Sequence, residues 1–214
     1  MATLAPHSQF RAGTMTQFLL NPSLLIYLTR HGETQYNRQN RFNGRTDSPL
    51  TEIGVAEAHR QGRVLSEVIG PGSALRIISS PLGRAVHTAE IIRDQMRIRG
   101  HEIETDPRLT EISFGEWEGL TVEQIKDRFP GEWERRHQNM WTYVVPGGES
   151  YEMVAHRVGD WLHEAHGAMI VVTHGGVERV LRGLYGGLPR QEIGHLAEPQ
   201  DLLFKLNDGQ ITAI

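Results

Sequence analysis

The sequence predicts an α/β fold, a three-layer sandwich in which helices flank a mostly parallel central sheet. Three largely apolar runs, Leu24–Thr29, Leu75–Ser79 and Ala168–Thr173, have the length and composition of strands that are buried on both faces. A turn and then apolar residues at helical spacing follow each run, and this alternation is typical of a parallel sheet covered by helices. With 214 residues, the chain has the length of one such domain.

The helices are predicted from apolar residues that recur on one face. Thr51 can cap the helix that follows the first strand. The inner face of this helix carries Ala58, Gly62, Leu65 and Ile69. The corresponding faces are Ala85, Thr88, Ala89, Ile92 and Met96 after the second strand, and Val177, Val180, Leu181, Leu184 and Tyr185 after the third.

Two further elements complete the predicted domain. A helix from Ser150 to His166 is indicated by a shared face of Val154, Val158, Trp161, Leu162 and Ala165. Strands 202–206 and 210–214, separated by Asn207-Asp208-Gly209, are predicted to form a terminal hairpin. We expect residues 23–214 to form a single domain, residues 1–22 a loose extension, and residues 117–148 a lid or insertion over the site.

Composition excludes several classes of protein. The chain is 38% hydrophobic and 22% charged, which is typical of a soluble globular domain. Its net charge of −4 argues against a general nucleic-acid binder, and it has no secretory signal or membrane-spanning run, so we expect a cytoplasmic protein without nucleic-acid or membrane partners. The absence of cysteine excludes disulfides and thiolate catalysis, whereas eleven histidines leave imidazole chemistry open.

Arginine and histidine side chains stand where the predicted strands end. Arg30 and His31 follow the first strand, Arg84 lies in or near the first turn after the second, and His174 follows the third. In parallel sheets these ends meet at one edge, where ligands bind. Two guanidiniums, two imidazoles and the N–H groups of helix N-termini suit a phosphoryl group. Neutral imidazole can attack phosphorus without first losing a proton, so a histidine is the candidate nucleophile.

The same chemistry needs an acid for the leaving oxygen. The loop Leu109–Gly119 contains Glu111, Glu116 and Glu118, and a carboxyl group shielded from water there would have a raised pKa suited to this role. Their spacing does not distinguish the three glutamates.

Several sequence blocks together resemble the histidine phosphatase superfamily, in its phosphoglycerate mutase-like branch. The blocks are Leu28–Thr34 (Leu-Thr-Arg-His-Gly-Glu-Thr) with Asn43–Thr51, then Ser79–Ala85, Leu109–Gly119, Pro146–Ser150 and Val172–Gly175, in the order of the family. The resemblance extends roughly from Leu24 to Pro189. Arg-His-Gly alone would be a weak signal, whereas the ordered set is specific.

The resemblance implies a role for each matching residue. His31 would become phosphohistidine, Glu111 would be the acid, and the phosphoryl oxygens would be held by Arg30, Arg84 and His174. Residues that would line the phosphate and substrate pocket are Asn37, Asn43, Gly44 and Gly175. No cofactor or metal is implied, and the partner would be a small phosphorylated substrate. The oligomeric state stays open, and a homodimer is compatible with the sequence.

Two activities fit this resemblance, and two features favour hydrolysis. Mutases of the family carry a longer basic insertion where this chain has only residues 121–145, and they favour Asn where Gly176 stands. Against this, Arg135 and Arg136 resemble the arginine pair with which mutases bind a substrate carboxylate, although an exposed helix face within residues 133–140 accounts for the pair somewhat better. We therefore expect a phosphatase that acts on small phosphomonoesters, with mutase-type phosphoryl transfer as the alternative.

Two other readings have less support in the sequence. A phosphoprotein-binding module would have lost the nucleophile or the acid, and this chain has both. His163 and His166 are three residues apart on a predicted helix, which is not the zinc-binding His-Glu-x-x-His spacing, so we expect no metal site.

Overall fold

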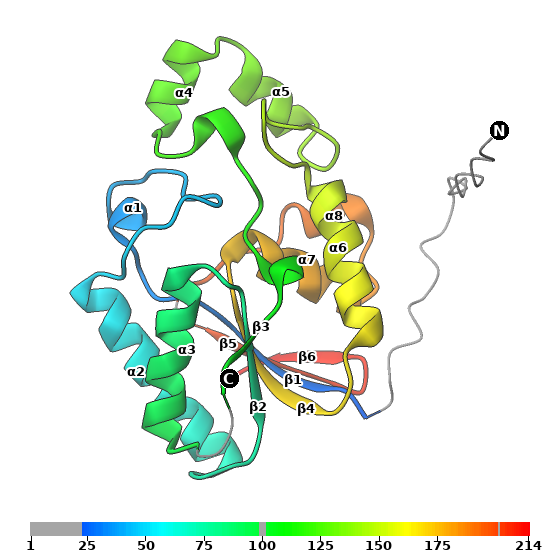
Figure 1. Ribbon diagram of the computed structural model, residues 1–214. Helices are drawn as coiled ribbons and strands as arrows, with labels where there is room; N and C mark the ends of the chain where they lie inside the picture. Colours follow the sequence, from blue (N-terminus) through cyan, green and yellow to red (C-terminus); the bar gives the residue numbers. More distant parts are fainter. Residues whose placement is uncertain (1–22, 99–101, 201) are drawn as a thin grey trace, which may run out of the picture.

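A mixed sheet forms the centre of the computed structural model, which describes residues 23–98, 102–200 and 202–214 (Figure 1). Within these residues the strands are β1 (Leu25–Arg30), β2 (Arg76–Ser79), β3 (Glu104–Thr105), β4 (Ala168–Thr173), β5 (Leu203–Asn207) and β6 (Gln210–Ala213). Their order is β3-β2-β4-β1-β5-β6. The first four in the chain run parallel, and the β5–β6 hairpin is antiparallel to β1. The predicted extension, residues 1–22, lies outside the described residues.

Helices cover both faces of this sheet. The helices of the described residues are α1 (Gln35–Arg38), α2 (Glu52–Ile69), α3 (Gly83–Met96), α4 (Val122–Arg128), α5 (Glu132–Gln138), α6 (Tyr151–Glu164), α7 (Gly175–Tyr185) and α8 (Arg190–Ile193). Figure 1 shows α2 and α3 on one side of the sheet and α6 and α7 on the other. Alternate residues of β1 divide accordingly, since Tyr27 packs with the α2–α3 core and Leu28 with the α6–α7 core. The predicted three-layer architecture is therefore confirmed.

Capping residues set the starts of the long helices. The Thr51 side chain accepts a hydrogen bond from the N–H of Gly54 at the start of α2, and Ser150 caps α6 at Met153. Helix α6 ends at Glu164, two residues before its predicted end, because Ala165 is extended and Gly167 takes a positive φ of 75° in the turn into β4.

The shortest elements were not predicted from the sequence. Strand β3 has two residues, and the 3₁₀ turns Pro107–Leu109 and Gly115–Trp117 are too short to show a periodic pattern. Helices α4 and α5 pack around a separate apolar cluster that includes Trp117, Ile125 and Val145. They lie at the upper end of the molecule in Figure 1, past the end of the sheet at which β1 leads into α1. Within the described chain, no helix combines the length and apolar character that crossing a membrane requires.

A buried carboxyl group on α7 makes stability depend on pH. Glu178 is fully buried 3.4 Å from Arg182 Nε, and neither of its carboxylate oxygens accepts a hydrogen bond within the described residues. Burial raises the pKa of Glu178 to about 8, although Arg182 opposes the shift. An unfolded glutamate has a pKa of about 4.3, so the folded state binds the extra proton between the two values and loses stability as pH rises through that window.

Raising the pH from 6 to 9 is therefore expected to lower the unfolding free energy of the wild type by about 3 kcal/mol more than that of Glu178→Gln, which cannot titrate. Urea unfolding of both proteins at the two pH values measures this difference. Glu152→Gln, which removes an exposed carboxylate paired with Arg190, should retain the wild-type loss. An equal loss in Glu178→Gln would show that Glu178 is already ionised at pH 6.

Candidate active site

His31 follows β1 directly and is held with one ring nitrogen available. Its backbone N–H donates to the carbonyl of Thr173 on β4, and its side chain is 2% exposed. Its Nδ1 lies 2.7 Å from the carbonyl oxygen of Gly32, which can only accept, so Nδ1 carries the proton and Nε2 the lone pair. Arg84 Nε donates to this Nε2 over 3.2 Å. The nitrogen that could attack phosphorus is thus already oriented.

Arg84 is fixed by groups on a different loop. It lies in the first turn of α3, and its guanidinium donates to the carbonyl of Gly44 at 2.6 Å and to Asp47 Oδ1 at 3.2 Å. Asp47 also accepts the N–H of Gly83, so it caps α3, for which Leu82 offers no side-chain cap. One carboxylate therefore holds both the helix and its arginine, which is buried against His31.

His174 and Arg30 complete the group at the strand ends. The rings of His31 and His174 have centroids 5.1 Å apart, and His174 Nε2 lies 2.7 Å from Ser80 Oγ. Within the described residues, His174 Nδ1 and Arg30 Nε are buried without a hydrogen-bond partner. Burial, together with the charge of Arg84, lowers the pKa of both histidines well below the ordinary value. Both imidazoles are therefore neutral at pH 7, as a nucleophile must be.

Glu111 lies against the beginning of α7. Its Oε1 accepts the N–H of Ile112 at 2.9 Å, and its Oε2 accepts the N–H of Gly176 at 3.4 Å. Burial raises the pKa of Glu111, and the charge of Glu198 adds to the shift. A side chain at position 176 would place its Cβ 2.8 Å from Glu111 Oε1, so glycine leaves the room that this carboxyl group occupies. A protonated carboxyl group here could donate to a leaving oxygen.

The other two glutamates of this loop are placed differently. Glu116 is exposed. Glu118 accepts the N–H groups of Arg45, Thr46 and Phe114, and thereby fixes the loop that carries Gly44 and Asp47. Burial alone would raise the pKa of Glu118, but these hydrogen bonds lower it, so the group stays an anion. Of the three candidates, Glu111 is the buried one whose pKa is raised.

A family model for the histidine phosphatase superfamily, branch 1, matches residues 26–201. The chain belongs to this superfamily. The match confirms the resemblance found in the sequence blocks, and it includes the five residues placed together above, Arg30, His31, Arg84, Glu111 and His174.

Curated relatives and solved structures of this superfamily include phosphatases and mutases. The chain is 35% identical over 194 residues to a 6-phosphofructo-2-kinase/fructose-2,6-bisphosphatase of Caenorhabditis elegans, and the match covers 88% of the chain but 40% of that enzyme. It is 34% identical over 172 residues to the probable phosphoglycerate mutase GpmB of Yersinia pestis (strain Pestoides F), covering 78% of the chain and 76% of the relative. The chain therefore spans less than half of the first relative.

Two solved structures share the fold along nearly the whole chain. The mycobacterial glucosyl-3-phosphoglycerate phosphatase in complex with VO3 has a TM-score of 0.74 and 28% identity, with 89% of this chain and 96% of that chain covered. A putative α-ribazole-5′-P phosphatase from Escherichia coli str. K-12 substr. MG1655 has a TM-score of 0.77 and covers 90% and 95%. Its identity is 24%, so this second likeness shows the fold alone.

Of the remaining site residues expected from the sequence, Gly44 contacts the central group through its carbonyl, which accepts a hydrogen bond from Arg84. Thr34 Oγ1 lies 2.9 Å from Asn37 Oδ1 and 3.2 Å from Asn43 Oδ1, within reach of either acceptor, and Asn37 also closes the capping box of α1. Gly175 begins α7 beside Arg30, as a Cβ there would lie 3.3 Å from its guanidinium carbon. Ligand contacts by these residues stay predictions.

The adjacent arginines of α5 separate, because consecutive side chains on a helix point in different directions. Arg136 is buried, with its guanidinium 5.5 Å from the ring centroid of Phe114 and 6.0 Å from that of Tyr151. Arg135 is 66% exposed and pairs with Glu132. The structure thus brings Arg136, but not Arg135, toward the candidate site, and substrate binding by the pair stays a prediction.

Sequence reasoning missed several residues that organise the site. They are Asp47, Ser80, Tyr151, Arg179 and Glu198. Asp47 contacts Arg84, Ser80 contacts His174, and Tyr151 contacts Arg136. Arg179 contacts both Tyr151 and Glu198. Arg179 follows Gly175 by four residues on α7, a spacing that places the two on one helix face and could have indicated it. Glu198 has no such signal, because it lies on an irregular segment far along the chain.

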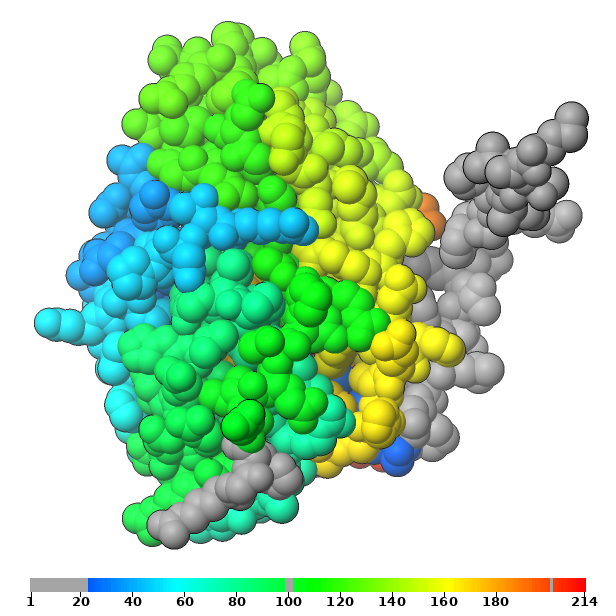
Figure 2. All heavy atoms as spheres, in the orientation of Figure 1, coloured from blue at the N-terminus to red at the C-terminus, as the bar shows by residue number. Residues whose placement is uncertain are grey.

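Ion pairs and a hydrogen bond connect the loops around the candidate site. Arg157 of α6 pairs with Glu149 at 3.1 Å and donates to the carbonyl of Glu111, while Arg45 reaches Glu149 from the opposite loop at 3.1 Å. Figure 2 shows this blue segment, which precedes α2, meeting the green loop and the yellow start of α6 across one face of the molecule. The loop that fixes Arg84 and the loop that carries Glu111 are thus joined through one carboxylate.

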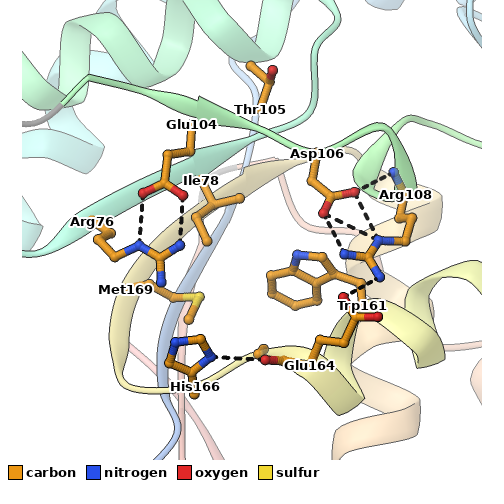
Figure 3. A pocket seen from close by; sticks show the side chains of 11 residues that line it. Arg76, Ile78, Glu104, Thr105, Asp106, Arg108, Trp161, Glu164, His166 and Met169 are labelled. Carbon is orange, nitrogen blue, oxygen red and sulfur yellow. Dashed lines mark hydrogen bonds and ion pairs between the residues drawn. The ribbon is translucent and has the colours of Figure 1, made fainter.

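A separate pocket lies at the β2–β3 edge and contains none of the predicted site residues (Figure 3). Its two arginines are neutralised locally, since Arg76 pairs with Glu104, and Arg108 pairs with Asp106 and Glu164. No group of three or more potential metal ligands occurs among the described residues.

Proposed function

We propose that the protein is a phosphatase that hydrolyses small phosphomonoesters through a phosphohistidine on His31. The observation that carries this proposal is the orientation of His31, whose Nδ1–H is taken by Gly32 and whose Nε2 lone pair lies beside the buried Arg84. A neutral imidazole held this way is a nucleophile for phosphorus, and the arginine neutralises charge on the phosphoryl oxygens.

Two steps complete the reaction. In the first, His31 Nε2 bonds to phosphorus as the ester P–O bond breaks, and protonated Glu111 gives its proton to the leaving alcohol oxygen. In the second, the Glu111 carboxylate takes a proton from water, the water oxygen bonds to phosphorus, and the P–N bond breaks to release phosphate. Arg30, Arg84 and His174 hold the three non-bridging oxygens through both steps.

Hydrolysis is favoured over mutase transfer by the surroundings of Glu111. Glycine at position 176 leaves room for the Glu111 carboxyl group. The mutase pattern has Asn at this position. The segment 121–145 is also short, with Lys126 as its one lysine. We propose that residues 117–148 border the substrate, because α5 brings Arg136 toward Tyr151 at the edge of the site.

Mutase activity is the second candidate, and Arg136 is the observation that favours it. A buried arginine beside the site could bind a substrate carboxylate, and a relative that is 34% identical carries the name probable phosphoglycerate mutase. A mutase would have to keep water from the phosphohistidine until the phosphoryl group is returned.

A panel assay tests the proposal. Phosphate release is measured with para-nitrophenyl phosphate, sugar phosphates, phosphoglycerates, nucleotides and phosphopeptides, and 3-phosphoglycerate is also supplied with a 2,3-bisphosphoglycerate primer. We expect phosphate release from small monoesters. Isomerisation of phosphoglycerate without net release of phosphate would overturn the phosphatase proposal and support mutase activity. Binding of a phosphopeptide with no turnover of any ester would instead identify a binding module.

A further inference from the structure

A carboxylate of the protein itself lies among the positive groups beside the catalytic histidines. Glu198 belongs to the segment between α8 and β5, and its Oε1 lies 3.1 Å from Arg179 Nη2. The hydroxyl of Tyr151 donates to the same oxygen over 3.4 Å and accepts from Arg179 Nη1 over 2.9 Å. Glu198 is therefore held by two side chains, from α6 and α7.

The backbone and the second carboxylate oxygen of Glu198 face the phosphoryl side of the site. Arg30 Nη1 donates to its main-chain carbonyl over 3.3 Å. A Cβ at Gly175 would lie 2.9 Å from Glu198 Oε2, so this oxygen rests against the start of α7. The same charge contributes to the raised pKa of Glu111. Glu198 thus lies between the candidate phosphoryl site and the Tyr151–Arg179 pair.

The groups around Glu198 would otherwise suit a second anion on the substrate. Arg136 and Arg179 have their guanidinium carbons 6.0 Å and 5.7 Å from the Tyr151 ring centroid, and two nearby guanidiniums are a typical site for a carboxylate or phosphate. Here one arginine is already paired, and a second anion would meet a carboxylate of like charge. Like charges brought together at a site repel one another, whereas a hydroxyl group could donate to the same carboxylate.

We propose that Glu198 determines substrate choice, by excluding phosphomonoesters that carry a second anionic group and accepting those whose remainder carries hydroxyl groups. The inference rests on the proposed phosphatase function and narrows its substrate class to phosphorylated polyols and sugars. It assigns Glu198 a role in specificity and none in the making or breaking of bonds at phosphorus.

Two substrates that differ in one group test this proposal. 3-Phosphoglycerate and glycerol 3-phosphate of the same configuration at C2 share a three-carbon frame, and a carboxylate in the first replaces a hydroxymethyl group in the second. The ratio of their kcat/KM values is measured for the wild type, Glu198→Gln and Glu198→Ala. We expect the wild type to prefer glycerol 3-phosphate, and both variants to shift the ratio toward 3-phosphoglycerate by at least about tenfold, mainly through its KM.

The control is Glu152→Gln, which removes one exposed negative charge paired with Arg190 and should leave the ratio at the wild-type value. If both substrates are hydrolysed and the ratio in the two Glu198 variants stays within about twofold of wild type, the carboxylate does not select the substrate and the inference is overturned. That result leaves the proposed function intact. If the wild type releases no phosphate from either substrate or from para-nitrophenyl phosphate, the proposed function fails, and the inference fails with it.

Discussion

His31→Ala is expected to lower phosphate release by at least about 10⁴-fold, because the variant has no side chain that can form the covalent intermediate. Arg84, the nearest hydrogen-bond partner of His31 Nε2, is a cation and cannot attack phosphorus. His174 cannot substitute easily, since its Nε2 is engaged with Ser80 and its ring lies 5.1 Å from that of His31. The loss should appear with every phosphomonoester that the wild type hydrolyses.

Steady-state assays measure the loss, and rapid acid-free quenching after incubation with a ³²P-labelled ester measures the intermediate. The wild type should retain acid-labile label on the protein, whereas His31→Ala should not. His163→Ala removes an exposed histidine of α6 and should keep both activity and label. Near-normal turnover in His31→Ala would show that another residue is the nucleophile.

The sequence predicted those site residues whose positions follow from the topology of a parallel sheet. Parallel strands bring their carboxyl ends to one edge, and the residues directly after β1 and β4, His31 and His174, are therefore neighbours although they are far apart in the chain. Arg84 follows from the same rule, since it begins the helix after β2. The family pattern selected Glu111 among three glutamates, and the structure gives a physical basis for that choice, because Glu111 is the one that is buried with a raised pKa.

The residues that hold these groups in place could not be predicted in the same way. Asp47 acts across space on Arg84 and on the N-terminus of α3, and no local pattern links an exposed loop aspartate to a helix in another part of the chain. The Arg135–Arg136 pair shows a different limit, because spacing alone cannot tell which side of a short helix faces the site. Glu198 depends on the path of an irregular segment, which has no periodicity.

Glu111→Gln is expected to lower hydrolysis of an alkyl phosphate by about 10²–10⁴-fold, because the amide cannot protonate the leaving alkoxide or take a proton from water. With para-nitrophenyl phosphate the leaving group needs no proton, so the first step should survive while the second slows. The variant should therefore give a burst approaching one nitrophenolate per protein molecule, followed by slow turnover. Glu116→Gln, an exposed change in the same loop, should leave both reactions at wild-type rates.

The pH profile separates this role from a structural one. Because burial raises the pKa of Glu111, the carboxyl group stays protonated to a higher pH than an ordinary glutamate, and hydrolysis of the alkyl ester should fall as pH rises through that pKa. Glu111→Gln should lose this alkaline fall. The absence of a nitrophenolate burst, or an unchanged pH profile, would assign the acid to another group and leave Glu111 a part of the scaffold at the start of α7.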